Sequence, residues 1–112
     1  MKLYHYSDRT LREVNPKFYG DNDYTPKRHL TKVSYYYTEN RPHEYRFNLL
    51  KCHIVSLSDS KIYTFKSEDY EKLDICLHIQ KIFDSGYNGI LYKQGNYNVC
   101  IVNKSLKVEG II

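Results

Sequence analysis

Apolar and polar residues alternate along several short segments of this chain, with the two-residue period of half-buried β-strands. Four such segments are predicted as strands: residues 2–7, 33–38, 45–57 and 61–65. Two further apolar runs, 90–92 and 97–102, flank Gly95 in a sequence typical of a hairpin turn. Residues 106–108 add a last short strand. The pattern therefore favours a mostly antiparallel sheet.

The period changes to that of a helix over residues 67–85. Ser67 precedes Glu68 and Asp69, which combines a capping hydroxyl with an acidic first turn. The apolar arc is broad, with one stripe and a flanking row: Leu73, Cys76, Leu77, Gln80 and Phe83, beside Ile75, Ile79 and Ile82. Such an arc predicts a helix packed closely on the sheet, and Gly86 is placed to end it.

A long polar segment, residues 8–32, separates the first two strands, and at most one helical turn fits within it, at residues 10–14. Three residues that interrupt regular structure divide it: Pro16, Gly20 and Pro26. A long loop in a small domain is usually functional. The whole chain, residues 1–112, is thus predicted to be a single α+β domain with one main helix.

Tyrosine is unusually frequent, at 13 of 112 residues, while tryptophan is absent. Its large ring and hydroxyl suit strands and pocket walls. The net charge of +4 is mild, so contact with nucleic acid or an acidic protein is permitted but not required. No apolar run approaches the roughly 18 residues of a membrane helix, and no signal peptide is visible, so we expect a cytoplasmic protein without membrane contact.

The cysteines and histidines form no recognisable metal motif. The three cysteines, Cys52, Cys76 and Cys100, are far apart and are expected as small buried residues in a reducing compartment. The five histidines also lack chelating spacings: His5, His29, His43, His53 and His78. Adjacent Cys52 and His53 point to opposite strand faces, so we expect no metal site. A Cys–His nucleophilic pair would need a tertiary contact that the sequence does not indicate.

A nucleic-acid surface is one interpretation of the tyrosine cluster. Tyr35, Tyr36 and Tyr37 resemble a stacking platform for bases. Three basic residues could follow a phosphate backbone: Arg46, Lys51 and Lys61. Alternation nevertheless sends Tyr36 to the opposite face from its neighbours, and one of these faces is expected to be core.

Short motifs occur in a characteristic order along the chain. They are His5-Tyr6-Ser7, Tyr36-Tyr37-Thr38-Glu39, Tyr45, Ser-Gly-Tyr-Asn-Gly-Ile at 85–90, and a hairpin ending at 98–103. In this order they resemble the His-Tyr-Glu branch of the ADP-ribosyltransferase superfamily, which includes diphtheria-type toxins and poly(ADP-ribose) polymerases. The chain looks most like very small phage and bacterial members, including an anti-CRISPR ADP-ribosyltransferase.

The resemblance spans nearly the whole chain and implies both a fold and an activity. The fold would be a compact ADP-ribosyltransferase-like α+β domain with a split, mostly antiparallel sheet. The activity would be ADP-ribosyl transfer from NAD, without a metal, by a toxin-like or anti-defence phage or bacterial effector in the host cytosol. The target would be a protein or nucleic acid of the host. Neither the acceptor group nor the oligomeric state follows from the sequence.

The same resemblance implies roles for individual residues. His5 would hold the ribose of the adenosine half of NAD and part of the nicotinamide amide, and Ser7 would bond the carboxamide. Tyr36 and Tyr45 would sandwich the nicotinamide ring, where a cation over an aromatic face gains roughly 0.5 to 2 kcal/mol. The implied NAD-binding set is His5, Tyr6, Ser7, Tyr36, Thr38 and Tyr45, and the implied catalytic set is His5, Tyr36 and Asn98.

One position departs from the family pattern. The third motif carries a glutamate on the penultimate strand, where this chain has Asn98. No acidic residue lies between Asp84 and Glu109. Asparagine can bond a ribose hydroxyl but supplies no negative charge beside an oxocarbenium-like sugar. Loop carboxylates that could substitute are Glu39, Glu44 and Glu68.

Three interpretations follow. The first is an NAD-dependent mono-ADP-ribosyltransferase, whose loops at residues 8–32 and 93–96 would select the target. The second is a catalytically lapsed module of the same fold that binds a nucleotide ligand or a macromolecular partner, which Asn98 favours. The third assigns structural roles: His5 as a core histidine bonded to a carbonyl, Tyr36 as ordinary packing, and a tyrosine-rich sheet that binds a partner.

Overall fold

The computed structural model describes residues 1–16, 32–41 and 49–112. Seven strands form one sheet, in the order β5-β6-β7-β3-β1-β4-β9. Their bounds are β1 Lys2–Ser7, β3 Ser34–Tyr37, β4 Lys51–Ser56, β5 Ile62–Thr64, β6 Gly89–Gln94, β7 Tyr97–Val102 and β9 Gly110–Ile111. Strands β2 (Glu13–Val14) and β8 (Leu106–Lys107) form a separate two-stranded ribbon. Among the strands of the described residues, β5–β6 is the only parallel pair of the seven-stranded sheet, so the predicted mostly antiparallel α+β class is confirmed.

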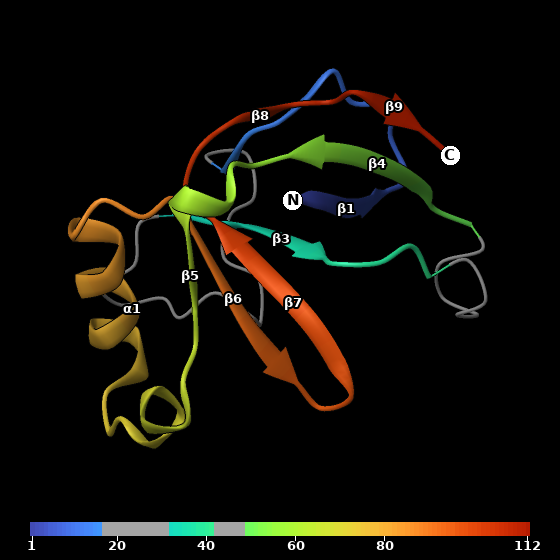
Figure 1. Cartoon of the computed structure of the whole chain (residues 1–112). Coiled ribbons are helices and arrows are strands. Elements are labelled where there is room, and N and C mark those ends of the chain that lie inside the picture. The colour runs from blue at the N-terminus through green and yellow to red at the C-terminus, as the bar shows by residue number, and fades with distance from the viewer. Residues whose placement is uncertain (17–31, 42–48) are drawn as a thin grey trace.

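One α-helix, α1 (Ile75–Asp84), and two short 3-10 helices, η3 (Asp59–Lys61) and η4 (Ser67–Glu71), complete the described elements. Figure 1 shows α1 beside β5 and β6, at the end of the sheet away from β9. Helix α1 connects these two parallel strands, as parallel pairing requires a crossover. Among the described residues, no helix has the length and apolar character needed to cross a membrane.

The sheet carries apolar side chains on both faces, so the core has two parts. The part beside α1 contains Val33, Ile79, Ile82, Phe83, Ile90 and Ile101. The part on the other face contains Leu3, Val14, Tyr36, Val55, Leu57, Cys100, Val102 and Leu106. Val14 and Leu106 belong to β2 and β8, so the ribbon covers the face of the sheet that α1 leaves open.

The helix predicted over residues 67–85 is wrong in its first half. Residues Ser67–Glu71 form the 3-10 helix η4, and α1 begins only at Ile75. The cap is Asp74 rather than Ser67, because its carboxylate accepts the Leu77 N–H at 3.0 Å. Leu73, which the stripe placed in the core, is fully exposed between the two helices. The predicted end is confirmed, since Gly86 follows α1 with φ +112°.

Two other predicted elements differ from the structure. Residues 10–14, where the pattern allowed at most one helical turn, form no helix, because Glu13 and Val14 form β2 and pair with β8. The strand predicted over residues 45–57 is observed only as Lys51–Ser56, and 42–48 lie outside the described residues. Leu49 is exposed in a turn, since β1 ends opposite Lys51 and offers no partner beyond it.

The C-terminal hairpin is confirmed. Strands β6 and β7 pair from Gly89 with Val102 to Gln94 with Tyr97. The turn places Gly95 at φ +61°, a left-handed conformation that glycine adopts without steric cost. The chain then adds β8 at the predicted position and a further short strand, β9, that the sequence pattern did not indicate.

Candidate functional site

Strands β1 and β3 are neighbours in the sheet but are joined by a single backbone pair, Tyr4 with Tyr37. By contrast, β1 pairs with β4 along all of Lys2–Ser7. Beyond Tyr4, the side chain of His5 reaches the neighbouring strand, and its Nδ1 lies 2.9 Å from the carbonyl oxygen of Tyr35. We call this junction between β1 and β3 the seam. Figure 1 shows β3 between β1 and β7, with β6 and β7 steeply inclined to β1 and β4.

His5 and Tyr36 lie together beside the seam. Their ring centroids are 5.5 Å apart, with the planes inclined by 56°. His5 is 7% exposed and Tyr36 is fully buried. Burial lowers the pKa of His5 below its usual value, although the bond to the Tyr35 carbonyl partly opposes this. The neutral ring then carries its proton on Nδ1, which leaves Nε2 as the acceptor nitrogen.

The face of the sheet that carries this pair is covered. Leu11 and the ribbon residues Val14 and Leu106 pack against the same apolar cluster as Tyr36. Figure 1 shows the segment after β1 running beside β8 over this part of the sheet. We call Leu11, β2 and β8 together the cover. With the cover in place, the Tyr36 ring has no surface for a ligand to stack on.

Thr38 and Asn98 meet at one side of the His5–Tyr36 pair. The Thr38 N–H donates to the Asn98 carbonyl oxygen at 3.3 Å, and the Thr38 hydroxyl donates to the same oxygen at 3.5 Å. Cys100 is paired with Tyr36, and Asn98 stands two residues earlier on the same strand face. The exposed Asn98 side chain therefore lies on the same face as Tyr36, one step along the sheet.

Ser7 lies two residues after His5 on β1, on the same face by alternation. Its Oγ accepts the Arg9 N–H at 3.2 Å and remains partly exposed. The structure thus gathers His5 and Tyr36, with Ser7 farther along β1 and Asn98 next to Thr38 at the end of β3. Tyr45 lies outside the described residues.

The Tyr6 side chain lies on the opposite face of the sheet from His5. Its hydroxyl donates to Asn40 Oδ1 at 2.7 Å and accepts the Arg41 N–H at 2.5 Å. Burial raises its pKa to about 12. Tyr6 can therefore contribute to a ligand on the His5 face through its backbone but not through its hydroxyl.

The tyrosines on that opposite face contact each other mainly by their edges. Tyr37 stands edge-on to Tyr6, Tyr35 and Tyr97, with ring centroids 5.8 to 6.2 Å apart. The guanidinium carbon of Arg41 lies 3.2 Å from the centroid of the Tyr97 ring. The predicted split of the triple tyrosine is confirmed, because Tyr36 alone of the three is fully buried. Ring faces that Arg41 and neighbouring edges occupy do not form a ready stacking platform.

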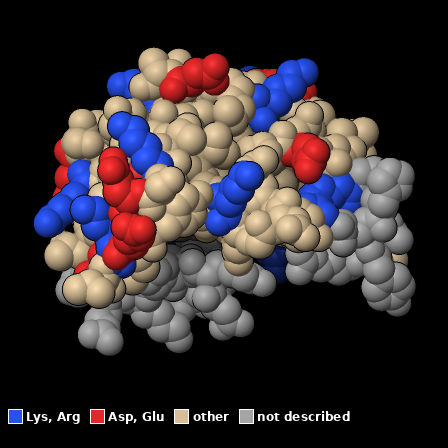
Figure 2. All heavy atoms as spheres, turned by 60° about the horizontal axis from the view of Figure 1, so that its bottom comes forward, with Lys and Arg blue, Asp and Glu red and all other residues tan. Residues whose placement is uncertain are grey.

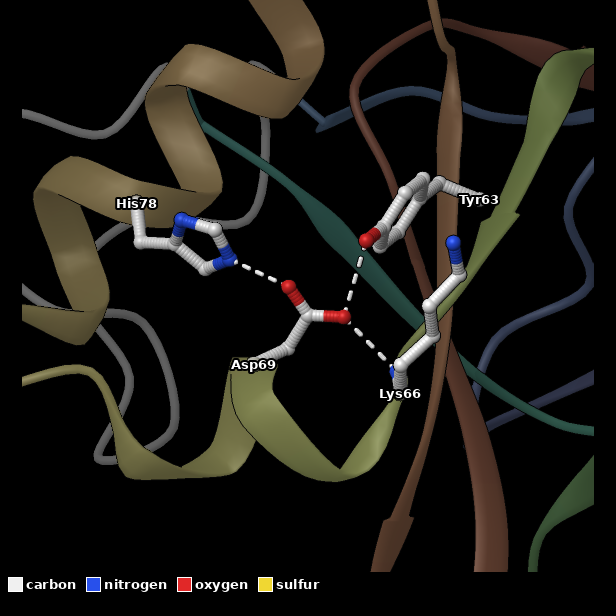
Figure 3. Close-up of polar contacts among 4 residues, drawn as sticks. All are labelled: Tyr63, Lys66, Asp69 and His78. Carbon is white, nitrogen blue, oxygen red and sulfur yellow. Dashed lines mark hydrogen bonds and ion pairs between the residues drawn. The ribbon is translucent and has the colours of Figure 1, made fainter.

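Sequence reasoning missed a buried polar network between β5, η4 and α1, shown in Figure 3. Asp69 is 3% exposed, and its carboxylate accepts three hydrogen bonds. The donors are Tyr63 Oη at 2.8 Å, the Lys66 N–H at 2.7 Å and His78 Nε2 at 2.7 Å. No spacing rule connects residues 63, 69 and 78, so only the fold brings them together.

The network keeps Asp69 ionised. Burial alone would raise the pKa of Asp69, but the bonds from Lys66, His78 and Tyr63 outweigh it, and the net shift is downward. The hydrogen bond that Tyr63 donates to Asp69 is also the main reason why the pKa of Tyr63 is raised. An aspartate that orients a histidine also occurs in catalytic dyads. Here the bonds join three secondary-structure elements, and we interpret the network as structural support for the junction of η4 with α1.

The described residues offer no group of three or more His, Cys, Asp or Glu side chains arranged to hold a metal ion. Figure 2 shows Lys and Arg interspersed with Asp and Glu on one face of the molecule, without a continuous basic patch among the described residues. This distribution agrees with the mild net charge of +4 and gives no electrostatic footprint typical of a nucleic-acid groove on that face.

Comparison of the chain with protein-family models, with curated proteins and with solved structures gives no match.

Proposed function

We propose that this chain is an ADP-ribosyltransferase-like domain that binds NAD at the seam and transfers ADP-ribose to a macromolecular target. The observation that carries the proposal is the placement of His5, Tyr36 and Asn98 on three successive strands, β1, β3 and β7, with the first two rings in contact. These are the residues to which the sequence resemblance assigns NAD binding and catalysis. They are far apart in sequence, so their common face is an independent support.

The geometry suggests how the residues would act. Neutral His5 donates from Nδ1 to the Tyr35 carbonyl, which fixes its ring beside Tyr36, where the ring would contact the ribose. Thr38 fixes the backbone of Asn98, whose exposed amide would bond another sugar hydroxyl. Release of nicotinamide leaves positive charge on the sugar, so the site must position and electrostatically support that sugar. The cover sets a condition: NAD reaches Tyr36 only when Leu11 and the ribbon shift away from the sheet.

The test is calorimetric titration with NAD together with nicotinamide release in bacterial lysate. We expect binding, and release that requires lysate. His5→Leu should weaken NAD binding by about fivefold, because it removes the polar ring and a lost hydrogen bond of this kind costs about 1 kcal/mol. The control is His78→Leu, which changes a histidine of the Asp69 network and should leave NAD affinity unchanged. Absence of NAD binding by the wild-type protein would refute the proposal.

A second candidate is a lapsed module that binds the nucleotide without turnover. Asn98 favours it, because this residue is exposed and neutral where the family pattern has a carboxylate. Binding of NAD without nicotinamide release, with and without lysate, would support this candidate over the enzyme.

Restoring the carboxylate gives a direct prediction. We expect Asn98→Glu to raise nicotinamide release by about tenfold or more, since a negative charge would then face the developing positive charge of the sugar. The side chain is exposed, so the fold should tolerate the change. The matched control is Asn96→Glu, which adds the same charge in the adjacent turn. Equal turnover by both variants would contradict the placement of the third motif at Asn98.

A further inference from the structure

His53 is a polar side chain with no exposed surface, and it lies directly opposite His5 on the neighbouring strand β4. Its Nε2 accepts the backbone N–H of Leu11 at 3.0 Å. Its Nδ1 lies 3.2 Å from the carbonyl oxygen of His5 and donates to it. The two contacts require opposite roles of the two nitrogens, which fixes the tautomer with the proton on Nδ1. A buried imidazole is costly unless it is satisfied in this way.

The contact with Leu11 matters because Leu11 lies over the His5–Tyr36 pair. This residue belongs to the cover, and its side chain packs against the cluster that contains Tyr36. The ribbon of β2 and β8 is a sheet of its own and is not part of the seven-stranded ladder. A backbone bond holds Arg12 to the chain after β8, because its carbonyl oxygen accepts the Val108 N–H at 2.9 Å. Thr10 and Leu11, by contrast, are linked to β4 through side chains of that strand.

Two side chains of β4 reach this segment. Lys51 Nζ donates to Thr10 Oγ1 at 2.8 Å, but this bond is exposed, where water competes with it. The bond from the Leu11 N–H to His53 is part-buried, and opening it leaves an imidazole acceptor in the core without its partner. The His53 contact is thus the stronger of the two links to β4.

We propose that His53 is a positioning residue that tethers the segment 9–12 over the His5–Tyr36 pair and so controls access to that pair. The inference rests on the proposed NAD site for its functional consequence. If the tethered, covered state dominates, the observed NAD affinity is the intrinsic affinity reduced by the fraction of molecules in which the cover is open. Weakening the tether then raises that fraction.

The test compares two replacements of His53. His53→Leu removes the acceptor and fills a fully buried site with an apolar side chain of similar size. His53→Gln also removes the imidazole but keeps an amide oxygen that can accept the Leu11 N–H. The first readout is the hydrogen-exchange rate of the Leu11 backbone amide, compared with the rates of the amides in β1 and β4. The dissociation constant for NAD is the second.

We expect the Leu11 amide to exchange at least about tenfold faster in His53→Leu than in the wild-type protein, while His53→Gln stays close to wild type. NAD should bind several-fold more tightly to His53→Leu and not to His53→Gln. Unchanged Leu11 exchange in His53→Leu would overturn the tether. Accelerated exchange with equal or weaker NAD binding would overturn its control of access.

Failure of the proposed function is distinguishable from failure of this inference. If the wild-type protein does not bind NAD, the NAD site is refuted, and control of NAD access falls with it, while Leu11 exchange still decides whether His53 is a tether. If His53→Leu does not fold, hydrogen exchange of the wild-type protein can still show whether His53 holds Leu11. The Leu11 amide should then be more protected than the Arg9 amide, whose acceptor, Ser7 Oγ, is exposed. Equal protection of the two amides would refute the tether.

Discussion

Tyr36→Ala should lower the free energy of unfolding by about 3 to 5 kcal/mol, the usual cost of deleting a buried aromatic ring. Tyr36 has no exposed surface and belongs to the cluster between the sheet and the cover. The cover cannot collapse fully into the cavity, because β8 is followed by Glu109, whose N–H donates to the Ile54 carbonyl at 2.8 Å. The total free energy of unfolding of such a domain is about 5 to 15 kcal/mol, so this loss would remove a large part of its stability.

Urea unfolding of Tyr36→Ala, Tyr36→Phe and Tyr70→Ala measures this prediction. Tyr36→Phe keeps the ring and should lose no more than about 1.5 kcal/mol. Tyr70 is 47% exposed and serves as the surface control, with an expected loss of about 1 kcal/mol for alanine. If Tyr36→Ala were no more destabilising than Tyr70→Ala, Tyr36 would not be a core residue. The result also decides experimental design: NAD binding should be tested with Tyr36→Phe, since loss of binding by Tyr36→Ala would not separate a site role from unfolding.

Asp69→Asn should lower the free energy of unfolding by about 3 kcal/mol. The carboxylate accepts bonds from Tyr63, the Lys66 N–H and His78, and an amide replaces one of its two acceptor oxygens by a donor. A buried site thereby loses the negative charge that accepts all three bonds, including the contact with His78 Nε2 at 2.7 Å. The matched control is Glu68→Gln, the same change at the preceding, exposed position. A loss below about 1 kcal/mol for Asp69→Asn would show that the network does not support the junction of η4 with α1.

Acid pH gives an independent signature of the same residue. The folded-state pKa of Asp69 lies below its unfolded value, so the folded state binds the proton less readily. Its stabilising contribution is therefore fully present above the unfolded pKa of about 4 and is lost as pH falls through the folded pKa. The stability difference between the wild-type protein and Asp69→Asn should narrow as pH is lowered from about 6 to about 2. A constant difference would mean that Asp69 is already protonated in the folded protein.

Local signals in the sequence predicted much of the fold. Alternation located β1, β3 and β7, and Gly95 located the hairpin turn, because each of these features depends on neighbouring residues. The start of the helix was misplaced because Ser67 and Asp69 look like a cap and an acidic first turn. In the structure, Asp69 turns its carboxylate toward His78, and Asp74 takes the capping role. Which of two possible caps is used depends on a tertiary contact.

The candidate site was predictable only as a set of residue identities. The motif order singled out His5 and Tyr36, and the structure places their rings in contact. The sequence did not indicate that the cover buries them, since β2 pairs with a strand more than 90 residues away, Glu13 with Lys107. The sequence also assigned His53 no role, because its partner Leu11 lies in a loop 42 residues away along the chain. Contacts between distant segments leave no periodic pattern.

The seam has a consequence for the cooperativity of unfolding. Backbone ladders are continuous within β5-β6-β7-β3 and within β1-β4-β9, but the two groups share one backbone pair, Tyr4 with Tyr37. Between them, coupling depends on side chains. His5 bonds the Tyr35 carbonyl and contacts the Tyr36 ring, Tyr6 bonds Asn40, and Leu3 and Val55 share an apolar cluster with Tyr36. The molecule therefore consists of two potential folding units that melt as one only while this side-chain junction is intact. Substitutions there should broaden or divide a single unfolding transition, whereas substitutions within either ladder should only displace it.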